Sequence, residues 1–592
     1  MALSDFPRIE DHGVLFNNRS AALVSKDGEI DWACFPNFDS DPVFFSILDR
    51  SSGGYFAISP VDSDYKSSQR YKEDTNVLLT EFFYNDKLAL RLSDFLPMLD
   101  QPQALLPEIH RRVECFKEAI DVKIDFFPFN QKEKLEAVEF ADNGYIIKMG
   151  DRTQALSTDI KLDKKTNGIS GVFKMSAGEV TWFVTANSVK ESHHIKSFNS
   201  EHRLDETELF WKTLISKSRY SGEFSEWINR SVLALKGMFF DPKYFMVAAP
   251  TASLPEVVGG GENWDYRFMW IRDTAYVIDA LANLGHIDEA MKFFYSLVNQ
   301  IQADKGVIKS MYPISNSNAV VEREVPLNGY LDSKPVRFGN KAIEQFQLDQ
   351  YGSLINAINV AQKHGGTITT EMLEMVKTTA HKLMERWMEP DRSIWEMRSE
   401  DRQYVYSKIV AWEALNNAAT LLSNIESPEE INKIHAIADE IKKTVQEKGL
   451  DKTRHFYVQS FGSNNVDAAL LRLPLVGFCS PHDELFVNTF KEIEKRLMPT
   501  DFLFKRYEVE DGKPFSDNGF LLISFWYIED LALMGQVERA REGLGKLLTY
   551  FNDLHLLPEE LDLKDKKYLG NYPQALSHVG LVSAILALNQ YK

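Results

Sequence analysis

Cysteine is scarce in this 592-residue chain. Cys34, Cys115 and Cys479 lie far apart and form no Cys-x-x-Cys pair. This excludes a disulfide framework and a cysteine zinc site, and it favours a reducing compartment. The first residues, MALSDFPRIEDHG, have neither a basic start nor an apolar core, so we expect no secretory signal. We therefore predict a cytoplasmic location.

Long apolar runs and excess positive charge are also missing. No stretch reaches the roughly 20 apolar residues of a membrane-spanning helix, so we expect no membrane anchor. A net charge of -19 argues against nucleic acid or an anionic membrane as the main partner. Hydrophobic residues make up 44% of the chain, which is typical of a globular protein, and its length predicts two or more domains. The sequence carries no signal for an oligomeric state.

The N-terminal part, residues 1–205, has the pattern of an antiparallel β-sandwich. Short alternating or β-branched runs such as GVLFNN, AALVS and NVLLTEFFYN are separated by turn sequences. The polar residues 206–224 predict a linker or connecting helix. Residues 32–42 hold two prolines, a tryptophan and two aspartates. We expect them to form a structured loop; the alternative is that they reach into a neighbouring site.

Residues 225–592 follow the period of α-helices. We expect about twelve helices, with starts near Ser225, Asp273, Asp288, Glu344, Thr370, Tyr404, Ser427, Asp467, His482, Gly519, Gln536 and Gln574. Every second helix follows a long loop rich in Gly, Trp, Asn and carboxylates, whereas the other connections are short. Inner helices that all start at one end would bring these loops together. We therefore predict an (α/α)6 barrel with its site at one mouth, because a solenoid would need a constant repeat.

Two of these loops carry carboxylates suited to acid–base chemistry. Glu396 stands between Trp395 and Met397, and burial against an indole raises the pKa of a carboxyl group, as a general acid requires. Glu559 and Glu560 are adjacent, so we expect at most one to face the mouth. Carboxyls from different loops are the usual pair for hydrolysing a glycosidic bond. The alternative for each is surface charge or a hydrogen bond within its loop.

The first loop, GGGENWDYRFMWIRD at 259–273, combines glycines, tryptophans, arginines and carboxylates. Such side chains can grip a polyhydroxylated ring; the alternative is a plain glycine loop before a helix. Because no Gly-Lys-Ser/Thr follows, the glycines do not form a phosphate loop.

Several motifs in order resemble glycoside hydrolase family 15, the glucoamylase family, in its bacterial and archaeal branch. They are WDYRFMWIRD, PVRFGNKA, IWEMR, VDAALLRLPLVGF and LLPEELD…LGNYPQALSHVGL, with IEDHG and AALVSKDGEIDW near the N-terminus. The resemblance implies an inverting, exo-acting hydrolase that releases β-glucose from the non-reducing end of α-glucosides. It implies that Glu396 is the general acid and Glu559 the general base. The implied sugar-binding residues are Trp264, Trp270, Arg272, Asp273, Trp395, Arg506 and Tyr507.

The implied mechanism needs neither a metal nor an organic cofactor. Inversion predicts that the two carboxyl groups lie roughly 6.5–9.5 Å apart. An oligosaccharide or disaccharide is the expected partner. Starch-type α-glucans are our first expectation and α,α-trehalose the alternative; a non-catalytic sugar-sensing module is a further one. The loops 259–268, 310–340 and 398–406, together with 32–42, are expected to decide among substrates.

Overall fold

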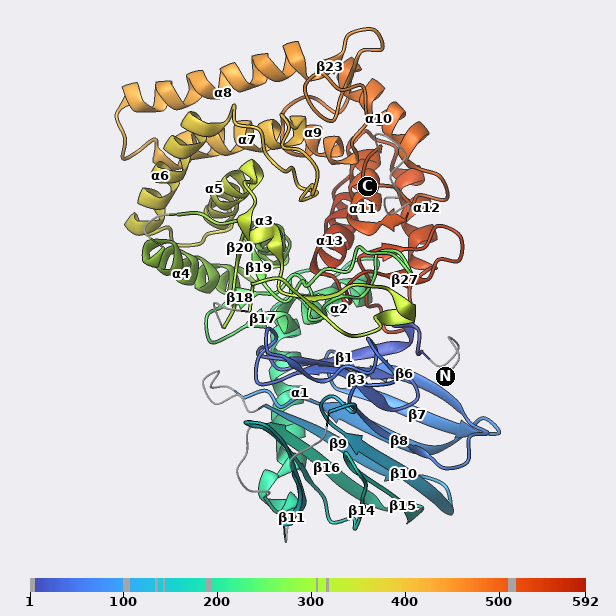
Figure 1. Cartoon of the computed structure of the whole chain (residues 1–592). Helices are drawn as coiled ribbons and strands as arrows, with labels where there is room; N and C mark the ends of the chain where they lie inside the picture. Colours follow the sequence, from blue (N-terminus) through green and yellow to red (C-terminus); the bar gives the residue numbers. More distant parts are fainter. Residues whose placement is uncertain are drawn as a thin grey trace.

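The computed structural model describes residues 6–99, 107–133, 137–141, 144–187, 193–304, 307–315, 319–508 and 518–591. An antiparallel β-sandwich forms the N-terminal part, and a helical barrel lies above it in Figure 1. This arrangement confirms the predicted fold class. The exact division at residues 205 and 224 stays a prediction.

Two eight-stranded sheets build the sandwich. The first contains β1 (His12–Phe16), β2 (Ala21–Ser25), β3 (Glu29–Cys34), β4 (Pro42–Phe44), β5 (Tyr55–Pro60), β10 (Ala119–Phe127), β14 (Asp163–Lys164) and β15 (Ile169–Ser176). The second contains β6 (Lys66–Tyr71), β7 (Leu78–Tyr84), β8 (Lys87–Phe95), β9 (Glu108–Cys115), β11 (Ala137–Ala141), β12 (Gly144–Met149), β13 (Arg152–Ser157) and β16 (Val180–Asn187). Burial alternates along β10, as expected for a strand with one covered face.

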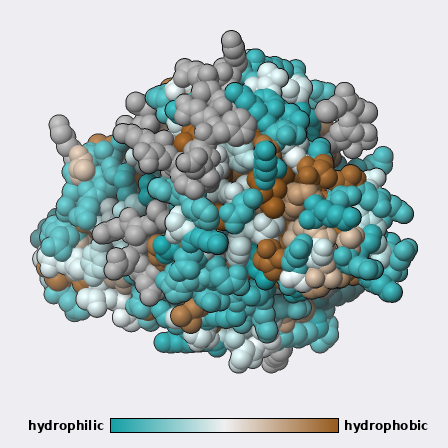
Figure 2. Space-filling view, turned by 90° about the horizontal axis from the view of Figure 1, so that it is seen from below, coloured by the Kyte–Doolittle hydropathy of each residue, from teal (hydrophilic) through white to brown (hydrophobic). Residues whose placement is uncertain are grey.

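A buried arginine ties the two sheets together. Arg111 on β9 pairs with Asp94 on β8 at 2.9 Å and donates to the carbonyl oxygens of Phe56 and Gly28 at 2.9 and 2.8 Å. Its charge is therefore compensated, as a buried charge must be. The outer surface of the sandwich is mostly hydrophilic with hydrophobic side chains interspersed (Figure 2).

The connecting helix α1 (Ser200–Ser216) leads into the barrel. The inner helices are α3 (Ile271–Asn283), α5 (Leu348–Lys363), α7 (Val405–Leu422), the short pair η7 (Ala468–Leu471) and α9 (Arg472–Leu475), α11 (Leu521–Leu533) and α13 (Ala575–Gln590). The outer helices are α2 (Ser225–Gly237), α4 (Ile287–Ala303), α6 (Thr370–Arg386), α8 (Pro428–Lys448), α10 (Glu484–Leu497) and α12 (Val537–Leu548). Each inner element contacts the next, and α13 contacts α3, so the ring closes.

Three details differ from the sequence prediction. The helix expected near Asp467 is reduced to η7 and α9, where Pro474 cannot donate a backbone hydrogen bond. The helix expected at Glu344 is a separate 3-10 turn, η6 (Lys341–Glu344), capped by Asn340, and α5 begins at Leu348. Strand β6 differs from the expected strand pattern, because its sequence, KSSQRY, has no apolar alternation.

Helices α3 and α11 are each followed by a glycine, Gly285 and Gly535. These glycines have φ of 97° and 77° just beyond α3 and α11, the left-handed position that glycine adopts most easily. Among the described residues, no helix combines the length and apolar character needed to span a membrane.

Residues 32–42 pack behind the first barrel loop. The indole nitrogen of Trp32 donates to the carbonyl oxygen of Pro250 at 3.0 Å. Nη1 of Arg267 donates to the carbonyl oxygens of Phe38 and Ser40 at 3.2 and 2.7 Å. Among the described residues that line the barrel-mouth cavity, none comes from this segment. The segment therefore supports the loop from outside.

Candidate active site

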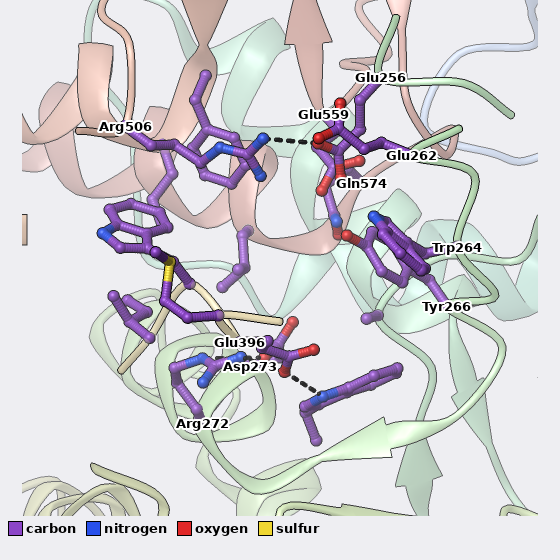
Figure 3. A pocket seen from close by; sticks show the side chains of 18 of the residues that line it. Glu256, Glu262, Trp264, Tyr266, Arg272, Asp273, Glu396, Arg506, Glu559 and Gln574 are labelled. Carbon is purple, nitrogen blue, oxygen red and sulfur yellow. Dashed lines mark hydrogen bonds and ion pairs between the residues drawn. The ribbon is translucent and has the colours of Figure 1, made fainter. Parts of the chain in front are cut away.

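A cavity of about 360 Å³ opens among the loops that precede the inner helices (Figure 3). Every site residue predicted from the sequence lines it, namely Trp264, Trp270, Arg272, Asp273, Trp395, Glu396, Arg506, Tyr507 and Glu559. They come from the first, third, fifth and sixth enriched loops, up to about 300 residues apart in the chain. The barrel thus brings together side chains that local sequence keeps separate.

Glu396 lies on one wall of the cavity, in the loop between α6 and α7. Its Oε1 accepts hydrogen bonds from Nε1 of Trp270 at 2.7 Å and from Nη2 of Arg272 at 3.0 Å. Its backbone has φ of 53°, a conformation uncommon outside glycine and concentrated at functional sites. Gln345 donates to its carbonyl oxygen at 3.2 Å. The backbone and one carboxylate oxygen are therefore fixed.

The indole that bonds Glu396 comes from Trp270, although the sequence argument pointed to the neighbouring Trp395. Trp395 instead donates from Nε1 to Asp467 at 2.9 Å, and its ring lies 6.1 Å from that of Tyr507. Neighbours in sequence diverge here because the backbone turns sharply at Glu396.

Arg272, in the first turn of α3, links Glu396 to a group of buried acids. Its guanidinium lies 3.2 Å from Asp349 and 3.5 Å from Asp273, and it donates to Oε1 of Gln347 at 3.0 Å. Burial raises the pKa of Asp273 to about 7, and the positive charge of Arg272 opposes this shift. The two residues of the predicted sugar-binding pair are thus both buried and lie within 3.5 Å of each other.

Glu559 lies on the opposite wall, immediately before β26 (Glu560–Leu561), and is 3% exposed. Burial raises its pKa well above the usual value, and the negative charges of Glu256 and Glu560 raise it further. Arg506 and a hydrogen bond from Tyr266 act in the other direction. Among the described residues, its Oε2 has no hydrogen-bond partner.

Only one of the two adjacent glutamates lines the cavity, as expected from their spacing. Glu560 is fully buried with one carboxylate oxygen 3.4 Å from Nη2 of Arg506. The same nitrogen donates to Oε2 of Glu256 at 2.6 Å. Arg506 therefore lies among three carboxylates beside the cavity.

Several lining residues were not identified from the sequence. They are Glu256, Glu262, Tyr266, Asn340, Met397, Arg398, Ser399 and Gln574, besides the apolar Ala248, Ile394, Phe520, Leu522 and Leu576. Tyr266 and Arg398 are each two residues from a predicted site residue, and Gln574 lies in the motif NYPQALSH. Glu256 has no comparable signal, because its partner Arg506 is 250 positions away.

An (α/α)6 barrel whose mouth holds two carboxylates on facing walls, with arginine and aromatic side chains between them, is the fold and site of a glycoside hydrolase. The family model described as Glycosyl hydrolases family 15 matches residues 222–586, and a Trehalase-like, N-terminal model matches residues 2–122. The chain belongs to glycosyl hydrolases family 15.

Curated relatives resemble the chain over nearly its whole length. A protein named trehalase from Thermoplasma volcanium is 44% identical over 584 residues, which is 98% of this chain and 94% of the relative. Another trehalase, from Thermoplasma acidophilum, is 43% identical over 562 residues, covering 95% of this chain and 97% of the relative. The structure of a bacterial glucoamylase complexed with acarbose superposes with a TM-score of 0.75 at 13% identity, covering 99% and 95% of the two chains. This last likeness establishes the fold alone.

Proposed function

We propose that this hydrolase is an inverting α,α-trehalase. The observation that carries the proposal is the 44% and 43% identity, over nearly the full length, to two proteins named trehalase. These relatives favour trehalose over the starch-type glucans that the sequence analysis placed first. Membership of a hydrolase family also favours an enzyme over a sugar-sensing module.

The size of the cavity supports a small substrate. Its volume of about 360 Å³ is near the lower end of the roughly 300–1,000 Å³ typical of small-molecule sites. A disaccharide fits this scale. A cytoplasmic location remains a proposal drawn from the cysteine content.

In the proposed reaction, protonated Glu396 gives its proton to the glycosidic oxygen. Among the described residues, the two hydrogen bonds to its carboxylate both reach Oε1, so Oε2 is the oxygen suited to carry that proton. Ionised Glu559 removes a proton from a water that attacks the anomeric carbon from the opposite face. The C–O bond breaks as the new one forms, and β-glucose results. The departing glucose keeps its own anomeric bond and leaves as α-glucose.

The remaining predicted residues have roles in binding. Arg272, Asp273 and Trp270 surround Glu396 and would hold the glucose whose bond is cleaved. The charge of Arg506 acts on Glu559, and the ring of Tyr507 lies 6.1 Å from that of Trp395. The separation of 6.5–9.5 Å between the two carboxyl groups stays a prediction of the inverting mechanism.

The test is to follow sugar release by NMR with trehalose, maltose, isomaltose and soluble starch as substrates. We expect trehalose to be preferred and to give equal initial amounts of α- and β-glucose. Only α-glucose would indicate retention and contradict the mechanism. Preference for maltose or starch would return the assignment to a glucoamylase type. Binding without turnover would support the sensing module.

A further inference from the structure

Arg398 shares the acid-bearing loop with Glu396 and lines the same cavity. Its guanidinium carbon lies 4.5 Å from the ring centre of Trp264. Its Nη2 donates to Oδ1 of Asn340 at 3.1 Å and is 3.6 Å from Glu322. Arg398 therefore lines the cavity, contacts the ring of Trp264 and belongs to the loop that carries Glu396.

The supports of Arg398 are themselves fixed. Asn340 is 1% exposed, and its Oδ1 also accepts from the backbone nitrogen of Ala342 at 2.9 Å while its amide donates to the carbonyl oxygen of Asp265 at 3.2 Å. A rigid acceptor on one nitrogen orients the planar guanidinium. The contacts of Arg398 with Asn340 and Glu322 are both made by Nη2. A guanidinium group has five N–H donors in all, spread over three nitrogens. Within the described chain, donors on Nη1 and Nε remain available to a ligand.

The position of Arg398 relative to the proton donor decides which part of the substrate it meets. In the proposed reaction, the glucose whose bond is cleaved would lie beside Trp270 and Arg272, which both donate to Oε1 of Glu396. The departing sugar must lie beyond the glycosidic oxygen that Glu396 protonates. Trp264 and Arg398 line the same cavity, and the Arg398 side chain is 35% exposed against 5% for Arg272, which indicates that Arg398 lies nearer the open side.

We propose that Arg398 recognises the departing glucose by donating hydrogen bonds to its hydroxyl groups, while the ring of Trp264 beneath it holds the guanidinium in place. The proposal rests on the proposed function, because it assigns the second sugar of a disaccharide. A guanidinium presents several N–H donors in a fixed fork, which can reach neighbouring hydroxyl oxygens. Arg398 is a specificity-determining residue and takes no part in the bond-breaking step.

The test compares the hydrolysis of two substrates by the Arg398→Ala variant and by the wild type. Trehalose has a sugar as its leaving group, whereas α-glucosyl fluoride has only fluoride. We expect kcat/KM for trehalose to fall about 30-fold or more, the loss of hydrogen bonds from a charged donor. Hydrolysis of α-glucosyl fluoride should change less than about threefold, which also reports that the variant is folded. Arg398→Lys should fall between wild type and Arg398→Ala, because it keeps the charge but not the fork.

Arg337→Lys is the matched control. Its guanidinium carbon also lies over Trp264, at 4.7 Å, but Arg337 is not among the described residues that line the cavity. Any loss of kcat/KM in Arg337→Lys should be equal for trehalose and α-glucosyl fluoride. Equal losses in Arg398→Ala, or no loss, would overturn the proposal. If the wild type prefers maltose, the proposed function fails, and the same comparison with maltose still tests Arg398.

Discussion

A Cβ atom on Gly570 would lie 2.4 Å from Oε2 of Glu559. Gly570 directly follows β27 (Tyr568–Leu569), which pairs with the strand that begins beside Glu559. Its φ is 73°, and its backbone nitrogen donates to the carbonyl oxygen of Pro255 at 2.8 Å. The absence of a side chain at Gly570 therefore leaves the space that the Glu559 carboxylate occupies.

Replacing Gly570 with alanine should displace the Glu559 carboxylate. We expect kcat to fall about 10²-fold, the cost of misplacing a reacting group by about an ångström. Gly535→Ala is the control, because Gly535 has a similar φ of 77° but no atom within 4 Å of an added Cβ. Steady-state kinetics with trehalose and thermal melts separate the two effects. Similar losses in both variants would mean that backbone strain, not the clash, is responsible.

Glu396→Gln and Glu559→Gln should each reduce turnover about 10³-fold or more, because glutamine can neither donate nor accept the transferred proton. Glucose release measures the loss, and circular dichroism checks folding. Glu400→Gln, in the same loop as Glu396 but exposed, should behave like wild type. Near-normal rates in either cavity variant would remove that residue from the mechanism.

The raised pKa of Glu559 should appear in the pH profile. A base must be ionised, so kcat/KM for trehalose should fall with decreasing pH at a point well above 4.5. Glu256→Gln removes a neighbouring negative charge and frees Arg506 from its 2.6 Å partner. Both changes favour the ionised form of Glu559, so the fall of kcat/KM on the acidic side of the pH profile should move to lower pH. A shift to higher pH, or none, would contradict the electrostatic account.

Folding stability should decrease as pH rises from about 4 to about 7. Burial raises the pKa to about 7 for Asp273, Asp391, Glu413, Asp467 and Glu529. The folded chain therefore binds more protons than the unfolded chain in this window, and that stabilisation is lost as these groups ionise. The pKa of His578, lowered by burial to about 3, acts oppositely below pH 6.5.

Melting temperatures at about pH 5 and about pH 7.5 test this expectation. Glu529→Gln should narrow the difference between them, because one titrating carboxyl is removed. A wild-type protein that melts higher at the more alkaline pH would contradict the prediction.

Much of the fold could be predicted because its signals are local. The loops before the inner helices differ in composition from the return connections. Two glycines, Gly285 and Gly535, stand where helices end. The two cavity glutamates also stand in recognisable motifs. The short η7 and α9 show the limit, because a proline interrupts a helix whose sequence has the usual apolar period.

The environment of the site could not be predicted, since it depends on contacts between distant segments. Glu256 and Arg506 are 250 positions apart, yet their pairing decides how much positive charge reaches Glu559. The indole on Glu396 is donated across 126 positions by Trp270. Neither contact leaves a spacing pattern in the chain.

Arg267 is locked between the two halves of the protein. Its Nη1 donates to the carbonyl oxygens of Phe38 and Ser40. The rest of its guanidinium pairs with Asp265, which is adjacent to Trp264 in the sequence. A protein that begins at Ser225 would lose those carbonyl acceptors, and Asp265 would remain as the partner of the buried Arg267 cation. A shortened active protein should therefore keep the N-terminal half, because that half supports the loop that carries Arg267 and Trp264.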